Sequence, residues 1–368
     1  MNYYIIAGEA SGDLHASNLM KELKRADADA HFRCWGGDLM KAQGAELVKH
    51  YRDLAFMGFT EVLMNLRTIL GNIDVCKKDI LAHRPDVLIL VDYPGFNLRI
   101  AEFAKAQGIK VFYYISPQVW AWKQSRVHKI KRVVDKMFVI LPFEKEFYEK
   151  FNYHVDFVGH PLLDAVSYFS TQSLTLSVTS EKPIIAILPG SRKQEISVML
   201  PLMLSMQKYY PEYQFVIAGA PSQSKAFYKT FIQHANVEIV YNETYLLLQK
   251  ATAALVTSGT ATLETALFGV PEVVCYKGSA ISYMIARQLV KVKYISLVNL
   301  IMDKEIVKEL IQNDLNEANL KAELDKLLNP ASRRQMLDNY AELKTTLGGS
   351  GASKKTAELM IAELKRTA

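Results

Sequence analysis

Short apolar runs recur along the chain, and most of them end at glycine, proline or small polar residues before a stretch with helical spacing. Runs this short, rich in β-branched residues, are typical of strands buried on both faces of a parallel sheet. We expect strands at Tyr3–Ala7, Val87–Val91, Val111–Ile115, Met137–Leu141, Val155–Val158, Ile184–Leu188, Gln214–Ala218, Val237–Val240, Ala253–Thr257 and Val273–Tyr276. The alternation of strand and helix predicts an α/β fold of doubly wound parallel sheets.

The alternation is interrupted at Ser170–Ser180, where the sequence becomes rich in serine and threonine. Such a stretch is typical of a linker. Because the alternation restarts directly afterwards, we expect two successive domains, residues 1–168 and 169–345. The last portion, Asn316–Arg366, is expected to be helical, with a Gly-Gly-Ser-Gly break before a final helix.

The stretch Ile184–Leu204 carries the first candidate phosphate site. Its strand ends at a proline and Gly190, and Ser191 and Gln194 have the spacing of a capping box, so we expect a helix to begin near Ser191. The free N–H groups at a helix N-terminus bind anions, and Arg192 adds a bidentate cation suited to phosphate. The alternative is an ordinary strand–helix turn with surface charges.

A second loop of this kind follows the strand Ala253–Thr257. Small residues, most with hydroxyl groups, open the next helix and favour another phosphate cradle; they are Ser258, Gly259, Thr260, Ala261 and Thr262. Glu264, in the first helical turn, is better suited to a ribose diol than to a phosphate. The alternative is a capped helix with a favourable N-terminal acid. Two such loops in one sheet favour a nucleotide diphosphate.

Candidate acids and bases follow two strands of the amino-terminal half. Asp92 stands at the carboxyl end of Val87–Val91, where ligands bind in open α/β sheets. Asp13 and His15 follow the first strand, near the glycine-bearing turn Gly8–Asp13. The alternative for each is a helix cap, a turn cap or a surface group.

Two tryptophans share the loop Ser116–Trp122, which also contains Gln118. Trp120 and Trp122 favour packing on a sugar or an acyl chain, with a domain contact as the alternative. The segment Lys123–Lys136, which includes Arg126, is strongly basic. A charge run of this kind is usually a solvated helix face.

Composition narrows the class of protein. The chain has 368 residues, half of them hydrophobic, and a formal net charge of +6, which permits an anionic substrate or membrane surface. Three scattered cysteines form neither a disulfide framework nor a zinc motif, which fits a reducing compartment. We expect neither a signal peptide nor a spanning helix, because no apolar run is long enough.

Several motifs together resemble the lipid-A-disaccharide synthases, glycosyltransferases of the GT-B architecture with two Rossmann-like domains. The matching segments are AGEASGDLHA at 7–16, MGFTEVL at 57–63, VDYPGFN at 91–97, SPQVWAW at 116–122, VGHPLLD at 158–164, LPGSRKQEI at 188–196, SGTATLE at 258–264 and SLVNLI at 296–301. Val298 departs from the family, which usually has proline there. The resemblance therefore covers almost the whole chain.

The resemblance implies the reaction and its substrates. The donor would be UDP-2,3-diacylglucosamine, the acceptor 2,3-diacylglucosamine 1-phosphate, and the products a β-1,6-linked disaccharide phosphate and UDP. It implies a GT-B fold, a segment 346–368 that packs back on the amino-terminal domain, and work at the cytoplasmic face of the inner membrane. We expect no nucleic-acid partner, no cofactor and no metal, and the oligomeric state stays open.

The resemblance also suggests roles for residues. Asp92 is the first choice for the base that deprotonates a primary hydroxyl, with Asp13 and His15 in reserve. Arg192 and the two helix N-termini would stabilise the departing UDP. Asn299 would contact the donor sugar or phosphate, and Glu264 would hold the ribose of the nucleotide.

A membrane contact is expected from an apolar loop. Phe56, Met57 and Phe59 crowd one loop, and apolar residues with helical spacing continue it as far as Leu70; we expect this helical part to pack on the core. An exposed cluster this apolar needs a partner, and a bilayer holding a diacylated substrate is one. Arg67 and the basic run would add attraction to anionic lipid.

Two alternatives from other classes stay open. A UDP-sugar 2-epimerase can share this architecture and binds UDP in its second domain, but it would act on one soluble sugar. A non-enzymatic protein could bind RNA or a membrane surface through the basic segment. That second alternative lacks an RNA-binding motif and leaves the phosphate loops unexplained.

Overall fold

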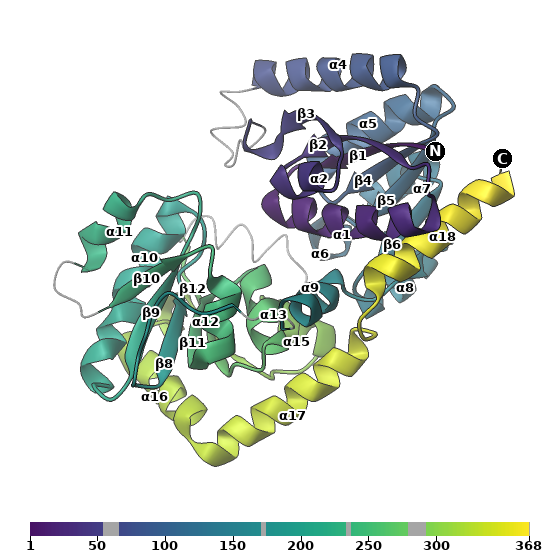
Figure 1. Ribbon diagram of the computed structural model, residues 1–368. Coiled ribbons are helices and arrows are strands. Elements are labelled where there is room, and N and C mark those ends of the chain that lie inside the picture. Colours follow the sequence, from purple (N-terminus) through teal and green to yellow (C-terminus); the bar gives the residue numbers. More distant parts are fainter. Residues whose placement is uncertain (54–65, 171–173, 233–236, 279–291, 368) are drawn as a thin grey trace. The chain divides into compact units, whose positions relative to one another are not determined.

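The computed structural model describes residues 1–53, 66–170, 174–232, 237–278 and 292–367. The chain forms two compact units (Figure 1). Unit 1 comprises Met1–Asp164 and Leu347–Ala368, and unit 2 comprises Ala165–Thr346. We propose that these units are the two domains, so that the chain passes from one to the other twice.

Unit 1 contains a seven-stranded sheet in the order β3-β2-β1-β4-β5-β6-β7, and its strand pairs are parallel. Its strands are β1 Asn2–Ala7, β2 His31–Gly36, β3 Glu46–His50, β4 Val87–Val91, β5 Lys110–Tyr114, β6 Lys136–Val139 and β7 Asp156–Phe157. Its helices are α1 Ala10–Ala26, α2 Asp38–Ala42, η1 Tyr51–Asp53, α4 Leu66–His83, α5 Pro94–Ala106, α6 Val119–Trp122, α7 Arg126–Val133, α8 Pro142–Glu149 and α18 Ala352–Thr367, with α9 Pro161–Ser170 at the boundary. The pattern of apolar runs misses β2 and β3.

The last helix, α18, completes unit 1. It packs along α1, as Figure 1 shows. Its first turn is capped from a distant part of the chain, because the carboxylate of Asp164 accepts hydrogen bonds from the backbone N–H groups of Gly351 and Ser353, the latter at 2.9 Å. Unit 1 is therefore assembled from the two ends of the sequence.

Unit 2 contains a six-stranded sheet in the order β10-β9-β8-β11-β12-β13, again with parallel pairs. Its strands are β8 Ile184–Leu188, β9 Gln214–Gly219, β10 Glu238–Tyr241, β11 Ala251–Thr257, β12 Glu272–Tyr276 and β13 Lys308–Ile311. Its helices are α10 Lys193–Leu204, η2 Ser205–Tyr209, α11 Lys225–Ile232, α12 Thr244–Lys250, α13 Thr260–Leu267, α15 Leu297–Met302, η3 Gln312–Asp314, α16 Glu317–Leu328 and α17 Pro330–Thr346.

Alternate residues of the unit 2 strands enter two separate cores. Ile185 and Ile187 of β8 belong to one apolar cluster, whereas Ile184, Ala186 and Leu188 belong to the other. A strand buried on both faces needs apolar residues at every position. This explains why short continuous runs predict these strands correctly.

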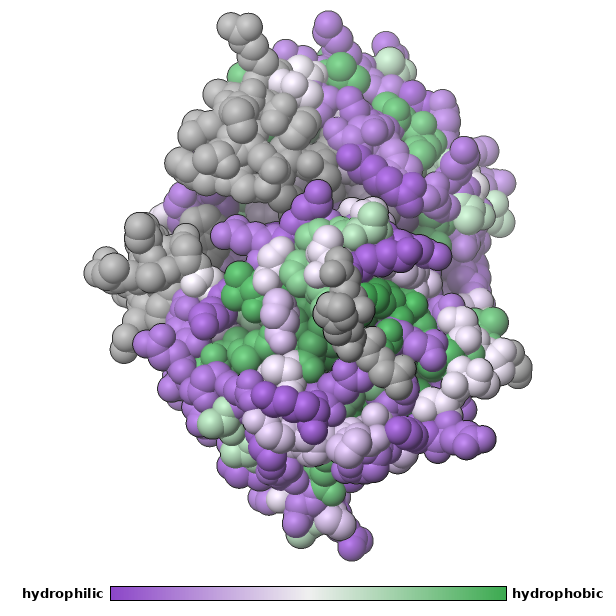
Figure 2. All heavy atoms as spheres, turned by 90° about the vertical axis from the view of Figure 1, so that its left-hand side faces the viewer, coloured by the Kyte–Doolittle hydropathy of each residue, from purple (hydrophilic) through white to green (hydrophobic). Residues whose placement is uncertain are grey.

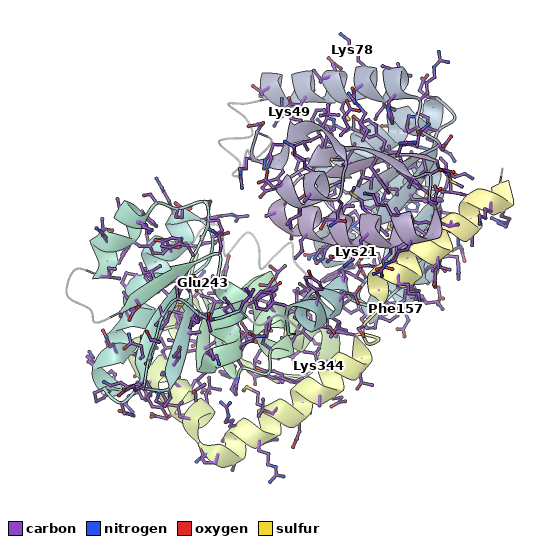
Figure 3. The ribbon with its side chains drawn as sticks, in the orientation of Figure 1. Lys21, Lys49, Lys78, Phe157, Glu243 and Lys344 are labelled. Carbon is purple, nitrogen blue, oxygen red and sulfur yellow. The ribbon has the colours of Figure 1, made fainter. Side chains whose placement is uncertain are left out.

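Polar contacts fix α4 against the edge of the unit 1 sheet. Arg33 of β2 donates to both carboxylate oxygens of Asp79, at 2.8 and 2.7 Å, and the hydroxyl of Tyr4 donates to the same carboxylate at 2.6 Å. Lys49 of β3, labelled in Figure 3, donates to the side chain of Asn72 at 2.7 Å. Charged residues are therefore accommodated in β2 and β3 because their partners lie on α4.

The outer face of α4 is partly apolar. Leu70, Val75 and Leu81 are 48%, 50% and 46% exposed, and Lys78 points away from the helix (Figure 3). The expectation that the helical part of the apolar stretch packs on the core is therefore wrong for Leu70. Ile69, its neighbour, does pack against the core of unit 1.

One of the two edge strands of the unit 2 sheet is β10. Figure 2 faces the side of the molecule that carries α11 and β10, and it shows hydrophobic residues gathered among hydrophilic ones. Half-buried apolar residues of this edge include Phe227, Phe231, Ile239 and Tyr241. The strand is short and exposes Glu238, both of which disfavour pairing with another chain.

Candidate active site

In unit 1 the chain reverses its direction across the sheet between β1 and β4, since β2 and β3 lie on one side and β5 to β7 on the other. Ligands of open α/β sheets bind outside the carboxyl ends of the strands at such a point. The loops that follow these two strands touch: a Cβ atom at Gly8 would lie 2.3 Å from Cγ of Tyr93. Gly8 and Asp92 therefore stand at the position where a ligand is expected.

Asp92 follows the last residue of β4 and is half-buried. Burial raises the pKa of its carboxyl to about 7, and the negative charge of Glu9 raises that pKa further, while a backbone hydrogen bond from Tyr93 lowers it. A base with a pKa near neutrality suits proton abstraction from a hydroxyl group. Glu9, two residues after the end of β1, was not among the residues expected to act. Its position after a predicted strand was the sequence signal that could have identified it.

Asp13 has a structural role. Its carboxylate accepts hydrogen bonds from the backbone N–H groups of Gly37, Leu39 and Met40, at 2.9, 3.1 and 3.1 Å, and it thereby caps the N-terminus of α2. Both oxygens of this buried carboxylate are already hydrogen-bonded within unit 1. The structure therefore argues against Asp13 as the reserve base, and the capping alternative is the one it supports.

His15 is also unsuited to the role of reserve base. The side chain is buried, and burial lowers its pKa to about 4, although the charge of Asp164 raises that pKa. Burial also lowers the pKa of His160, to about 3, and the nearby His15 lowers it further. His15 and His160 are therefore buried close to one another within unit 1.

The tryptophan loop forms α6, with Gln118 exposed at its start. Trp120 is half-buried and meets Phe143 edge-to-face, with ring centroids 4.9 Å apart. Since Phe143 belongs to α8, Trp120 packs within unit 1. Its contact with a sugar or an acyl chain stays a prediction. Arg126 is the first residue of α7 and is half-buried.

Unit 2 has its own reversal point, between β8 and β11. These strands are neighbours, with Leu188 paired to Val256. Both candidate phosphate loops therefore follow the carboxyl ends of adjacent strands. Gly190 has a left-handed φ of 98°, and a Cβ atom there would lie 3.5 Å from Cγ2 of Thr257. Among the described residues the buried hydroxyl of Thr257 has no hydrogen-bond partner, so a donor for a ligand remains there.

The expected capping box at Ser191 and Gln194 is wrong by one residue. The helix α10 begins at Lys193 with Arg192 as its N-cap, and the carboxylate of Glu195 accepts from the backbone N–H of Arg192 at 3.4 Å. The reason is that Arg192 has extended backbone angles and so cannot be helical. The guanidinium of Arg192 is exposed and pairs with Glu195 at 3.4 Å.

Most hydroxyl groups of the second loop donate hydrogen bonds to backbone carbonyls of unit 2. Ser258 donates to the carbonyl of Ile295 at 3.0 Å, and Thr262 donates to that of Gly259 at 2.8 Å. Thr260 is exposed at the first position of α13, and the following residue is Ala261. The first N–H groups of this helix lack partners within the helix, so the loop retains its capacity to bind an anion.

Glu264 lies in α13 and is anchored by a neighbour. Its carboxylate accepts a hydrogen bond from the hydroxyl of Tyr245 at 2.8 Å, and burial raises the pKa of the carboxyl. That contact uses one carboxylate oxygen. The role of Glu264 toward a ribose stays a prediction.

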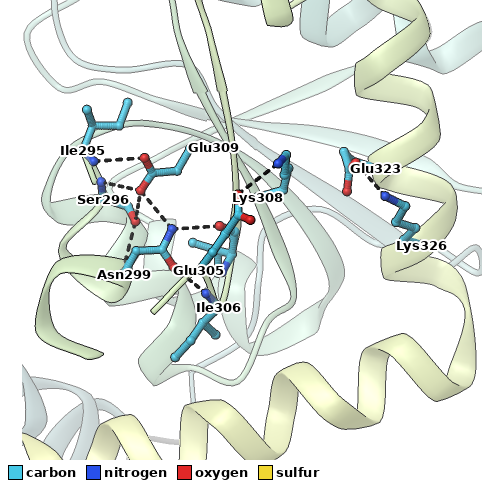
Figure 4. Close-up of polar contacts among 10 residues, drawn as sticks. Ile295, Ser296, Asn299, Glu305, Ile306, Lys308, Glu309, Glu323 and Lys326 are labelled. Carbon is cyan, nitrogen blue, oxygen red and sulfur yellow. Dashed lines mark hydrogen bonds and ion pairs between the residues drawn. The ribbon is translucent and has the colours of Figure 1, made fainter. Parts of the chain in front are cut away.

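The side chain of Asn299 is hydrogen-bonded within unit 2 (Figure 4). Its side-chain oxygen accepts from the backbone N–H groups of Ile306 and Val307, at 2.7 and 3.0 Å. Its side-chain nitrogen donates to the carbonyl of Val307 at 2.8 Å and to Glu309 at 2.9 Å. The side chain is fully buried. The expected contact between Asn299 and the donor sugar is therefore not supported, because its hydrogen-bonding groups are already used.

The remaining expected residues fall where the structure is not described. Phe56, Met57 and Phe59 lie outside the described residues, as do the side chains of Arg67 and Trp122. In the described ranges, no three His, Cys, Asp or Glu side chains are grouped so as to hold a metal ion. Within those same ranges, no helix has both the length and the apolar character needed to cross a membrane.

Comparison with known proteins gives a consistent result. The family model described as lipid-A-disaccharide synthetase matches residues 3–363. The lipid-A-disaccharide synthase of Syntrophus aciditrophicus (strain SB) is 41% identical over 374 residues, which are 99% of this chain and 98% of that protein. The structure resembles UDP-GlcNAc 2-epimerase from Neisseria meningitidis (TM-score 0.69, 14% identity, 98% and 100% of the two chains). It also resembles the calicheamicin glycosyltransferase CalG4 (TM-score 0.64, 16% identity, 100% and 98%). At these identities the two structures establish the fold alone, which is the expected GT-B fold.

Proposed function

The chain belongs to the lipid-A-disaccharide synthetase family, and from that premise we propose how its two units divide the work of the reaction. The protein is a glycosyltransferase of lipid A disaccharide synthesis. Its substrates are a sugar nucleotide and a lipid-linked sugar phosphate. In our proposal the donor is UDP-2,3-diacylglucosamine, bound through the loops of unit 2, and unit 1 activates the acceptor, 2,3-diacylglucosamine 1-phosphate.

In the proposed step the primary hydroxyl oxygen of the acceptor attacks the anomeric carbon of the donor sugar. The bond from that carbon to the UDP oxygen breaks, and its electron pair leaves with UDP. The hydroxyl proton passes to the carboxylate of Asp92. A single displacement inverts the anomeric centre from α to β. The leaving UDP needs charge stabilisation, which Arg192 and the N-termini of α10 and α13 supply.

The observation that carries the proposal is the position of Asp92. It stands at the reversal point of the unit 1 sheet, directly after β4 and beside Glu9, and its pKa is raised to about 7. A carboxyl with this pKa is half ionised at neutral pH and binds a proton more tightly than an ordinary aspartate does. No other acid expected to act combines these properties, since Asp13 is a helix cap.

The variant Asp92→Asn tests this role, because it keeps the shape of the side chain and removes its basicity. We expect kcat to fall by roughly 100-fold or more while the affinity for UDP, measured by calorimetry, stays unchanged. Asp29→Asn is the matched control, since Asp29 is exposed between α1 and β2, and it should retain full activity. Turnover near the wild-type value in Asp92→Asn would remove Asp92 from the mechanism.

We propose metal-independent transfer, because the cationic groups that stabilise the leaving UDP come from the protein. Addition of EDTA to the assay should then leave kcat unchanged. Loss of activity in EDTA, followed by recovery with one divalent cation, would contradict this proposal.

We also propose that the protein attaches peripherally to the cytoplasmic face of the inner membrane. The support from described residues is the outer face of α4, where Leu70, Val75 and Leu81 are each about half exposed. The double change Phe56→Ser with Met57→Ser should lower binding to anionic vesicles and leave UDP affinity intact. Vesicle binding that survives this change but disappears in high salt would show that attachment is electrostatic.

A further inference from the structure

The backbone at the proposed base adopts an uncommon conformation. Asp92 and Tyr93 are consecutive residues with left-handed φ angles, 45° and 47°. Residues with a Cβ atom seldom occupy this region, and they persist in it only where the surroundings hold them there. Strain of this kind gathers at functional sites, where it is part of the arrangement of the reacting groups. Neighbouring residues must therefore hold Asp92 and Tyr93 in this conformation.

Two buried side chains converge on the carbonyl oxygen of Asp92. The hydroxyl of Tyr113 donates to it at 2.5 Å, and Nδ2 of Asn97 donates to it at 2.7 Å. The same Nδ2 also donates to the carbonyl of Val91 at 3.3 Å. The backbone N–H of Asp92 donates to the carbonyl of Tyr114 at 3.2 Å. The main chain of Asp92 is therefore bonded at both its N–H and its carbonyl.

The two donors come from different elements and are fully buried. Asn97 lies in the first turn of α5, and Tyr113 lies in β5, the strand next to β4. Their positions are fixed by the core on both sides of the loop. If the carbonyl of Asp92 turned toward an ordinary right-handed conformation, both donors would lose their acceptor in a buried environment, which is costly.

We infer that Asn97 and Tyr113 form a positioning pair, which holds Asp92 in the left-handed conformation that aims its carboxylate at the acceptor hydroxyl. This inference rests on the proposed role of Asp92 as the base. Neither Asn97 nor Tyr113 reaches the substrate in this scheme, because their donor groups are spent on the main chain. They act on the reaction through the direction of one carboxylate.

The inference predicts a loss confined to turnover. A displacement of about 1 Å at a catalytic group can cost on the order of 100-fold in rate. We expect Asn97→Leu, which removes the bonds to the carbonyls of both Asp92 and Val91, to lower kcat on that order, and Tyr113→Phe, which removes one bond, to lower it by roughly 10-fold. The KM values and the affinity for UDP should stay near those of the wild type. The acidic limb of the kcat–pH profile should also shift, because the carboxyl would leave its half-buried position.

A rescue experiment separates positioning from a general loss of structure. Glycine adopts left-handed φ angles without strain, whereas alanine does not. In the Asn97→Leu background, the second change Tyr93→Gly should restore kcat by roughly 10-fold, because one of the two consecutive left-handed residues then adopts its angle without strain. The matched second change Tyr93→Ala removes the same ring and should restore nothing.

The results of these variants test the positioning pair separately from the role of Asp92 as the base. If Asp92→Asn is inactive while Tyr113→Phe and Asn97→Leu keep the wild-type kcat and pH profile, the positioning pair is refuted and the base remains. If Asp92→Asn itself is active, the proposed base fails. If Tyr93→Gly and Tyr93→Ala rescue equally, or kcat falls only as the folded fraction falls, the two residues are structural alone. Should Asn97→Leu fail to fold, the isosteric Tyr113→Phe carries the test.

Discussion

Removal of the Asn299 side chain should destabilise unit 2 and leave ligand binding to the folded protein unchanged. The residue joins α15 to the segment Ile306–Val307 and to Glu309 of β13 through four hydrogen bonds of 2.7 to 3.0 Å, and it is fully buried. In Asn299→Ala, the N–H and the carbonyl of Val307 lose this partner, and so does Glu309, whereas the N–H of Ile306 keeps its bond to the carbonyl of Lys304 at 3.0 Å. The change therefore concerns backbone groups that water does not reach.

The magnitude follows from the groups left unpaired. Each buried polar group without a partner costs about 1–3 kcal/mol. Two backbone groups, both of Val307, lose this partner, and local relaxation recovers part of the cost, so we expect a loss of about 2–4 kcal/mol in the free energy of unfolding of unit 2. Asn316→Ala is the matched control. Asn316 caps α16 at an exposed position, where the loss of a cap costs about 1 kcal/mol.

The distribution of tryptophan provides a selective assay. The three tryptophans, Trp35, Trp120 and Trp122, all lie in unit 1. Urea unfolding followed by tryptophan fluorescence therefore reports on unit 1, whereas far-ultraviolet circular dichroism reports on both units. In Asn299→Ala an early transition should appear in the dichroism and be absent from the fluorescence. The reasoning is refuted if both midpoints match the wild type while the affinity for the UDP-sugar falls tenfold.

Three other predictions concern single charges. Glu9→Gln should move the acidic limb of the kcat–pH profile to lower pH, because the charge of Glu9 raises the pKa of Asp92; an unmoved limb would contradict this. Arg192→Ala should weaken UDP binding by about 1.5–3 kcal/mol, whereas Lys193→Ala, one residue along, should not, and calorimetry compares the two. Glu272 is fully buried with neither oxygen paired among the described residues, and burial raises its pKa. The fold therefore favours the protonated carboxyl of Glu272. Its contribution to the free energy of unfolding is present below the pKa of the unfolded chain, and it is lost as the pH rises toward the pKa of the folded protein. The gain in Tm from Glu272→Leu should thus be larger at pH 8 than at pH 5, and an equal gain at both would show that Glu272 does not titrate.

The sequence predicted the strands that form continuous apolar runs and missed β2, β3 and β13, whose apolar residues are interrupted by charged ones. β4 and β8 are continuous apolar runs, so their pattern is decisive. β2 and β3 contain arginine, lysine and glutamate, and the partner that makes Arg33 acceptable in a strand is Asp79, 46 residues away. A pattern read within one window cannot include a partner at that distance.

The same limit explains which candidate site residues were placed correctly in the fold. Asp92 was placed correctly at a strand end because strand ends follow from local pattern. Asp13 was expected to be a reserve base because it follows a glycine-bearing turn after a strand, and Asn299 was expected to contact the donor because of the family resemblance. Their partners, Gly37 and Glu309 among them, lie 24 and 10 residues away. Sequence spacing shows where a polar group stands, but the hydrogen bonds that occupy it depend on the fold.

The passage of the chain out of unit 1 and back has a consequence for synthesis on the ribosome. Unit 1 needs α18, which packs on α1 and is capped by Asp164, yet these partners are separated by the whole of unit 2. At the usual rate of translation, about 10–40 s pass between the synthesis of Asp164 and that of the last residue. During that interval the face of α1 that α18 later covers has no partner from its own chain. The nascent amino-terminal half is therefore a natural substrate for chaperones, and unit 2 can finish folding first.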